Sequence, residues 1–201
     1  MVVIFINNQL VRFGGDMSVG AFGIANRIVF IFVMFVMGIN QGMQPIAGYN
    51  YGAQKLDRMM QVVKLSIIAA TVIMILGWFL AMLAPRQCVS LFTTDQHLID
   101  TTVHGMRRMM LMLPIVGYQM VITNFFQCIG KVKISIFLSL SRQLLFLLPA
   151  LALLPIWFGL DGVWLAQPVS DFIASVVTAW IMIVYMHKFK LQHKENQYGR
   201  Q

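Results

Sequence analysis

The longest stretch without a formal charge constrains the fold of this chain most strongly. It runs from Ile28 to Gln54, between Arg27 and Lys55. As a helix, it is long enough to cross a hydrocarbon layer of about 30 Å. Its second half, from Gly38 onwards, also carries five carboxamide side chains. Because lipid offers carboxamides no hydrogen-bond partners, this half should face protein or water.

Glycine and proline interrupt the same stretch. Gly38 and Gly42 are four residues apart, as are Gly48 and Gly52, and this spacing predicts close approach of a neighbouring helix. Pro45 lies between the two pairs, removes one backbone donor and favours a kink. On composition alone, a tightly packed helix whose amides bond to its neighbours is favoured over a ligand site.

Composition excludes an ordinary soluble domain. Hydrophobic residues make up 59% of the 201 residues and charged residues 11%, whereas soluble chains carry about 25% charged residues. The charges lie in short clusters between apolar runs. The formal net charge of +8 therefore indicates basic loops on one side of a membrane rather than nucleic-acid binding. We predict an all-α fold, a polytopic membrane helix bundle.

The apolar runs define the expected crossings. We expect a partial crossing at residues 1–11, full crossings at 17–46, 65–84, 97–130, 134–157 and 163–186, and a basic tail at 187–201. The RFGGD sequence at 12–16 predicts a turn at the membrane surface. Because residues 1–11 span only about half a bilayer, we expect the chain to be truncated at its start. LFTTD at 91–95 predicts a short interfacial helix, with Thr94 or Asp95 capping the next helix.

The distribution of Lys and Arg predicts the orientation. One side would carry nine basic residues: Lys55, Arg58, Lys64, Lys131, Lys133, Lys188, Lys190, Lys194 and Arg200. The other side would carry four: Arg12, Arg86, Arg107 and Arg108. Since cytoplasmic loops hold the excess of basic residues, we expect a multi-pass protein of the bacterial plasma (inner) membrane with a cytoplasmic C-terminus.

The order of residues in the charge-free stretch resembles one family. QGxQPIxGYNYGA at positions 41–53, followed by a basic loop, is similar to the end of the eighth helix and the next loop of multidrug and toxic compound extrusion (MATE) transporters. Its motif residues are Gly42, Pro45, Gly48, Asn50 and Gly52. Three later stretches resemble the family in the same order: Phe126, Gln127, Gly130 and Lys131 in helix 10, Arg142, Gln143 and Pro149 in helix 11, and Pro168 and Asp171 in helix 12.

The resemblance implies both a fold and a function. The chain would form one MATE-type lobe, the end of helix 7 plus helices 8–12, which is the C-terminal half of a twelve-helix protein. The family implies xenobiotic efflux by multidrug/cation antiport, coupled to H+ or Na+ influx. The implied partners are a small amphipathic or cationic substrate, membrane lipid and the missing N-terminal lobe, without nucleic acid or an organic cofactor.

Three charges lie inside the expected crossings. Asp171 is the only carboxylate well inside one, and an unpaired ion there costs about 2.5 to 3.5 kcal/mol. It should therefore be paired, with Arg142 the obvious partner, or else titrate as a proton- or cation-binding group. Arg27 and Arg142 could each line a water-filled cavity, or extend to the membrane surface along an apolar stem, and a structural role is favoured for Arg27. Pairing is favoured over ligand contact, because a permanent cation would repel cationic substrates.

Amides and one tyrosine supply neutral contacts for a substrate cavity. The candidates are Asn7, Asn8, Gln41, Gln44, Tyr118, Asn124 and Gln127. Sites for amphipathic ligands are mostly apolar with a few placed polar groups. Hydrogen bonding between helices is the alternative use of the same side chains. The sequence does not separate the two.

Other chemistry is poorly represented in the sequence. Sodium-coupled members of the vibrio type carry carboxylates in helices 7 and 10, but Met109 to Gly130 contains no Asp or Glu, so coupling would fall to the N-terminal lobe. His and Cys show no metal-ligand spacing, and Cys88 and Cys128 should not pair. No catalytic constellation indicates an enzyme.

Two other interpretations are open. One is a lipid-linked oligosaccharide flippase of the same superfamily, which would need more cationic residues in its cavity to hold a pyrophosphate. The other is a non-transporting gene remnant, since one lobe cannot alternate access alone.

Overall fold

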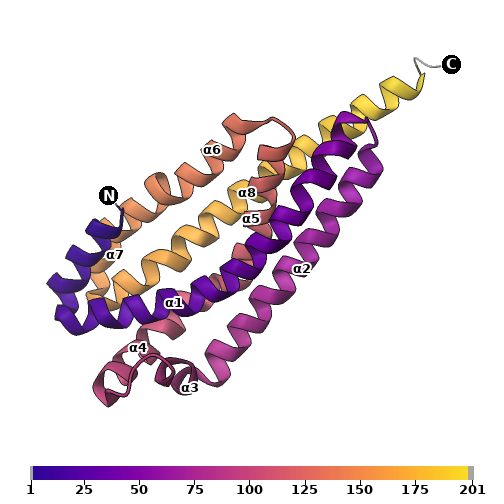
Figure 1. The fold of residues 1–201 in the computed structure, drawn as a ribbon. Coiled ribbons are helices and arrows are strands. Elements are labelled where there is room, and N and C mark those ends of the chain that lie inside the picture. The colour runs from indigo at the N-terminus through magenta and orange to yellow at the C-terminus, as the bar shows by residue number, and fades with distance from the viewer. Residues whose placement is uncertain (1, 199–201) are drawn as a thin grey trace.

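Figure 1 shows the fold of the chain, a computed structural model that describes the backbone of residues 2–198 and the side chains of 2–187 and Phe189. In chain order the elements are α1 (Val2–Gly52), α2 (Leu56–Leu83), α3 (Pro85–Ser90), α4 (Gln96–Met109), the 3-10 turn η1 (Met110–Met112), α5 (Leu113–Cys128), α6 (Val132–Leu140), the π-helical turn η2 (Ser141–Leu147), α7 (Leu148–Phe158) and α8 (Leu160–Tyr198). No strand occurs in this part of the chain, so the predicted all-α fold is confirmed.

Five helical stretches are long and apolar enough to cross a membrane: Val2–Gly52, Leu56–Leu83, Gln96–Cys128, Val132–Phe158 and Leu160–His187. They lie side by side, and successive stretches run in opposite directions (Figure 1). The predicted polytopic helix bundle is confirmed by this arrangement. Several boundaries differ from the expected ones. The first long helix, α1, continues to Gly52 rather than ending at 46. The second crossing begins in a helix that starts at Leu56 rather than Leu65, and α8 continues to Tyr198, into the expected tail.

A glycine divides α1 within the predicted surface turn at 12–16. Gly15 has φ 68° and ψ −174°, a conformation that glycine adopts without the steric cost of a side chain. The short N-terminal part folds back toward α7, while the long part runs the length of the bundle (Figure 1). The backbone stays helical through Pro45, where the sequence favoured a kink.

Prolines follow two irregular turns inside the crossings. In a regular helix, proline lacks the N–H for the carbonyl four residues earlier, and its ring clashes with that carbonyl. Pro114 follows the 3-10 turn η1, and Pro149 follows the π-helical turn η2. The expected crossings at 97–130 and 134–157 are therefore each built from two α-helices joined by an irregular turn. Such π-helical turns occur often at functional sites.

The connection between the second and third crossings differs from the prediction. The short helix is α3, which starts at Pro85, in a position that proline tolerates. The prediction of a short helix at LFTTD is wrong, because Leu91 and Phe92 form a turn that follows α3. Asp95, rather than Thr94, caps α4, since its Oδ1 accepts hydrogen bonds from the N–H groups of His97 and Leu98 at 2.9 and 3.4 Å.

Close helix packing depends on glycines that the sequence did not single out. A Cβ placed on Gly117 of α5 would lie 2.8 Å from the carbonyl oxygen of Ala70 on α2. By contrast, Gly38, Gly42 and Gly52 have no such neighbour within 4 Å. The predicted close approach at the first glycine pair is therefore wrong within this lobe, because that face of α1 is exposed.

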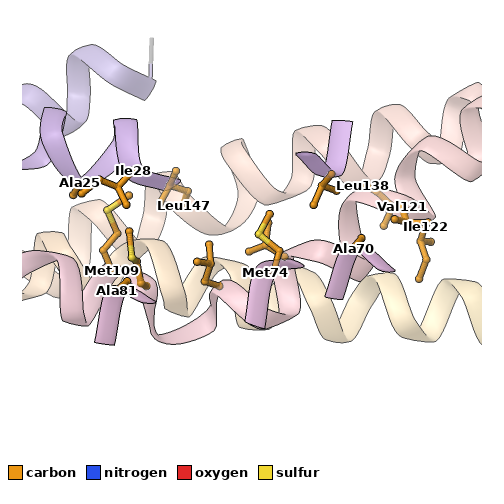
Figure 2. Packing of buried hydrophobic residues seen from close by; sticks show 14 of the residues in the cluster. Ala25, Ile28, Ala70, Met74, Ala81, Met109, Val121, Ile122, Leu138 and Leu147 are labelled. Atoms are coloured by element: carbon orange, nitrogen blue, oxygen red, sulfur yellow. The ribbon is translucent and has the colours of Figure 1, made fainter. Parts of the chain in front are cut away.

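The remaining interior is filled by aliphatic side chains, methionine and aromatic rings. Figure 2 shows Ala25 and Ile28 of α1, Met74 of α2 and Leu138 of α6 pointing into the space between the helices. Trp164 of α8 is 1% exposed and packs against Phe22 with a ring-centroid distance of 5.7 Å. This core fixes the relative positions of α5, η2 and α8, which carry six of the twelve buried polar residues in the described part of the chain.

Candidate functional site

Two adjoining, partly open cavities lie around Arg142. The larger, about 250 Å³, is lined by Gln119, Met120, Thr123, Asn124, Leu138, Ser139, Arg142 and Gln143. The smaller, about 140 Å³, is lined by Val29, Val33, Met109, Leu113, Val116, Met120, Arg142, Gln167 and Asp171. Met120 and Arg142 line both. We call the larger one the Arg142 cavity.

The two opposite charges on η2 and α8 lie together beside these cavities. Arg142 Nε lies 3.0 Å from Asp171 Oδ1, and the side chains are 29% and 7% exposed. The widened turn η2 carries Arg142, whose backbone carbonyl accepts a 2.9 Å hydrogen bond from the Ser170 hydroxyl. Neighbouring residues of α8 thus hold both the backbone and the side chain of Arg142. Arg142 lines both cavities, and the more deeply buried carboxylate of Asp171 lines the smaller one.

Amides connect α1 and α5 at the rim of the Arg142 cavity. Gln44 Nε2 donates to Asn124 Oδ1 at 3.1 Å, and Asn124 Nδ2 donates to the carbonyl of Met120 at 2.9 Å. Of the amide candidates, Asn124 lines the cavity, and the hydrogen bond from Gln44 holds the Asn124 side chain in place. Their hydrogen bonding between helices is also the structural alternative that the sequence left open.

Two buried amides near this contact have side-chain atoms without hydrogen-bond partners among the described residues. Gln119 is 3% exposed and its Oε1 has no hydrogen bond; Asn40 is also 3% exposed and neither of its amide atoms has one. Asn40 lies one turn before Gln44 on α1, and Gln119 lies just over one turn before Asn124 on α5. Because these helices run in the same direction, the two amides lie at about the same level. Buried amides without protein partners indicate a place for water or a polar ligand.

The other predicted cavity residues lie outside these two cavities. Tyr118 donates through its hydroxyl to the carbonyl of Ser175 at 2.7 Å, so it joins α5 to α8. Asn7 is half-buried in the first part of α1, and Asn8 and Gln127 are exposed. A role for these four residues in substrate contact stays a prediction.

One exposed face of α1 carries the remaining intramembrane charge. Arg27, Gly38, Gln41 and Pro45 are all exposed and lie on the same side of the helix at helical spacing. Among the described side chains, no ion pair involves Arg27, in contrast to the expected pairing. An arginine and an amide on a membrane-crossing helix are stable facing water or protein rather than lipid.

The family-motif residues have local structural roles. The Asn50 side chain donates to the carbonyl of Ile46 at 2.8 Å near the end of α1. A Cβ on Gly48 would lie 3.4 Å from the carbonyl oxygen of Cys128. Gly48 therefore packs closely against the end of α5.

Sequence reasoning missed Gln119, Thr123 and Ser139 as residues of the Arg142 cavity. The spacing of Gln119, Thr123 and Asn124 on one helix was the available signal.

Carboxylates and metal-ligating groups are sparse near the cavities. No group of three or more His, Cys, Asp or Glu side chains lies together within the described part of the chain. Cys88 and Cys128 are both free. The chemistry of the site is thus that of hydrogen bonding, one ion pair and apolar contact.

These observations define a polytopic membrane protein, a helix bundle with a polar cavity built around a paired charge. The chain belongs to the MatE family, whose profile matches residues 1–151. It is 25% identical over 177 residues to the multidrug export protein MepA of Staphylococcus aureus (strain MSSA476), covering 88% of this chain and 38% of that protein. A MepA of Staphylococcus haemolyticus (strain JCSC1435) is 26% identical over 167 residues, covering 81% and 36%.

Solved structures of transporters share this fold. The MATE multidrug transporter DinF-BH, in complex with rhodamine 6G, is 40% identical, with a TM-score of 0.77, over 89% of this chain and 40% of that one. An outward-facing MATE family transporter of the MOP superfamily matches in fold, with a TM-score of 0.87 at 21% identity, over 94% and 43%. The chain therefore spans less than half the length of its relatives, which are transporters and not enzymes.

Proposed function

We propose that this chain is the C-terminal half of a multidrug/cation antiporter that exports amphipathic or cationic compounds. The observation that carries the proposal is the Arg142 cavity, a mostly neutral polar hollow inside a lobe of the MatE family. Multidrug export is named for its relatives, and the lobe supplies amides, methionine and apolar side chains of the kind that suit varied ligands. The missing N-terminal lobe would complete the path.

The exposed face of α1 supports a path between two lobes. Arg27 and Gln41 lie on that face together with Gly38, and polar groups at membrane depth need water or protein. In alternating access, two lobes rock about a site between them. The α1 face and the Arg142 cavity would then contribute this lobe's share of the path.

The coupling ion is proposed to be H+ or Na+, bound mainly by residues outside this lobe. Asp171 is held by Arg142 at 3.0 Å, so its charge is already balanced. Met109 to Gly130 has no carboxylate. Carboxylates of the N-terminal lobe are therefore the proposed coupling groups.

The proposed location is the bacterial inner membrane with a cytoplasmic C-terminus. The α1–α2 turn, the α5–α6 turn and the far end of α8 lie at the same end of the bundle (Figure 1). These are the regions in which the sequence places most basic residues, and the excess of basic residues favours the cytoplasm.

The flippase alternative is not favoured. A pyrophosphate-linked lipid would need several cationic groups, whereas Arg142 is the one charged side chain among the described residues that line the larger cavity. A gene remnant, the other alternative, would export no dye from cells.

Dye efflux tests the proposed function. Efflux-deficient bacteria expressing the complete reading frame that contains this chain should accumulate several-fold less rhodamine 6G than cells with empty vector. Dissipating the proton gradient should abolish this difference in dye accumulation if H+ is the coupling ion, and removing sodium should abolish it if Na+ is. A matched variant with the change Leu153→Ala should export normally, because Leu153 is 64% exposed on α7 and lines neither cavity. Unchanged dye accumulation in cells with verified expression would contradict the proposal.

A further inference from the structure

The end of α5 carries a motif that the cavities do not use. The N–H of Lys131 donates to the carbonyl of Phe126 at 2.9 Å, and that of Gly130 donates to the carbonyl of Gln127 at 3.2 Å. Gly130 has φ 77°, in the left-handed region that glycine adopts without steric cost. This pattern is the Schellman cap, which closes the last turn of a helix. The cap therefore fixes Phe126, a fully buried ring, on the last turn of α5.

The end of α1 closes in the same way. The N–H of Lys55 donates to the carbonyl of Asn50 at 2.9 Å. The N–H of Gln54, which has φ 57°, donates to the carbonyl of Tyr51 at 3.1 Å. The two caps thus each hold one aromatic residue at the end of the bundle where the α1–α2 and α5–α6 turns lie (Figure 1). We call this end the basic end.

Two rings of α8 join the capped helix ends. Tyr185 and Phe126 have a ring-centroid distance of 5.2 Å and an interplanar angle of 74°. Phe189 lies 6.2 Å from Tyr185 and 6.0 Å from Tyr51. Aromatic pairs favour such distances and tilted orientations. Phe189 is 6% exposed, although α8 projects beyond the other helices at this end (Figure 1). The four rings, which we call the aromatic cluster, therefore connect α1, α5 and α8.

The aromatic cluster lies on the side of the Arg142 cavity that faces the basic end. Gln119 and Thr123 of α5 line that cavity, whereas none of the four rings lines it. Phe126 is seven residues after Gln119, which places it on the same side of the helix and about 10 Å nearer the basic end. Closely packed apolar space stays dry. The rings therefore form a dry layer beyond the polar cavity.

We propose that the aromatic cluster is a seal that closes the Arg142 cavity toward the basic end, with Phe126 as its central ring. Water and ions then reach the cavity from the exposed α1 face and not through the inner end of the lobe. This inference rests on the proposed function, because an antiporter needs a site that is never open to both sides of the membrane at once. It assigns a role in transport to Phe126 and Tyr51, which belong to the two motif stretches.

Labelling of a cavity thiol from each side of the membrane tests the seal. In the complete gene product, with Cys88 and Cys128 replaced by serine, Thr123→Cys places a thiol in the cavity. A membrane-impermeant maleimide is added to sealed vesicles of either orientation, and an epitope tag at the C-terminus reports which vesicles expose the basic end. Phe126→Ser should speed labelling from the tagged side about 10-fold and leave labelling from the other side within about two-fold of native, because a hydroxyl in place of the ring admits water.

Matched variants separate a seal from general damage. Phe126→Leu keeps the layer apolar, so labelling from the tagged side should stay at the native rate. Phe22→Ser removes another buried ring, which packs against Trp164 near the start of α8, and it should not speed labelling from the tagged side. Phe189→Ser, at the outer edge of the aromatic cluster, should act in the same direction as Phe126→Ser. It replaces that variant if loss of the central ring prevents folding.

The outcomes decide between a seal and other causes. Unchanged labelling from the tagged side in the Phe126→Ser and Phe189→Ser variants would overturn the inference, as would an equal rise with Phe22→Ser. A rise on the tagged side matched by a fall on the other would also overturn it, because that result is a shift between the two access states of the carrier. If labelling follows the expected pattern but the native protein exports no dye, the proposed export function fails and the seal stands.

Discussion

Replacing Arg142 by Gln while Asp171 is retained should destabilise the chain by about 3 to 5 kcal/mol, the range measured when one partner of a buried ion pair is removed. Asp171 is 7% exposed in its side chain, and no neutral hydrogen-bond donor reaches its Oδ1 from the described residues. Its charge is thus balanced by Arg142 alone in this part of the chain. Without the arginine, a carboxylate would remain uncompensated inside a membrane-crossing bundle.

The matched variants make this prediction sharp. The paired change Arg142→Gln with Asp171→Asn should recover most of the loss, because no charge is then left buried. Asp171→Asn alone should cost less than Arg142→Gln, since Arg142 is 29% exposed and can turn toward the cavity. Chemical denaturation in detergent micelles measures the three free energies of unfolding. If Arg142→Gln and the paired variant proved equally stable, the pair would have no role in holding η2 to α8.

Alanine at Gly117 should destabilise the fold by about 1 to 3 kcal/mol, as overpacking of a tight contact does. The new Cβ would lie 2.8 Å from the backbone oxygen of Ala70. Backbone cannot rotate away as a side chain can, so α2 and α5 must separate. That separation would also disturb Gln119, which lines the Arg142 cavity.

The same substitution at Gly42 should have the opposite sign. Gly42 has no heavy atom of a neighbour within 4 Å of an added Cβ, and Ala is favoured over Gly inside a helix by about 0.5 to 1 kcal/mol. Thermal unfolding of the chain in detergent compares the two variants directly. A loss of stability at both positions, or at Gly42 only, would show that the packing of α1, α2 and α5 is misassigned.

The features that could be predicted from the sequence are those set by composition and by unusual residues. A charged side chain inside a membrane-crossing span is costly, so charged residues mark the ends of the spans. The number of crossings can therefore be counted from the sequence. Asp171 and Arg142 were expected to meet because a membrane interior leaves an isolated charge few alternatives, and the structure places them 3.0 Å apart.

Features that depend on neighbours were harder to predict. A glycine looks the same in sequence whether it contacts another helix, as Gly117 does, or faces outward, as Gly38 does. The amides show the same difficulty. Asn124 and Gln41 are similar in character, but one lines a cavity and the other lies on an exposed helix face. The position of each depends on the rotation of its helix, which packing across the bundle decides.

The central claim is that the Arg142 cavity is a water-filled part of the substrate path, and thiol labelling tests it most directly. In the complete gene product, with Cys88 and Cys128 replaced by serine, Gln143→Cys places a thiol in the cavity. Leu153→Cys places one on the outer surface of α7, where the native side chain is 64% exposed. We predict that a membrane-impermeant maleimide labels the cavity thiol, that rhodamine 6G slows this labelling, and that the thiol at position 153 stays unlabelled in lipid. Absence of labelling at position 143, or labelling there that the dye leaves unchanged, would contradict the claim.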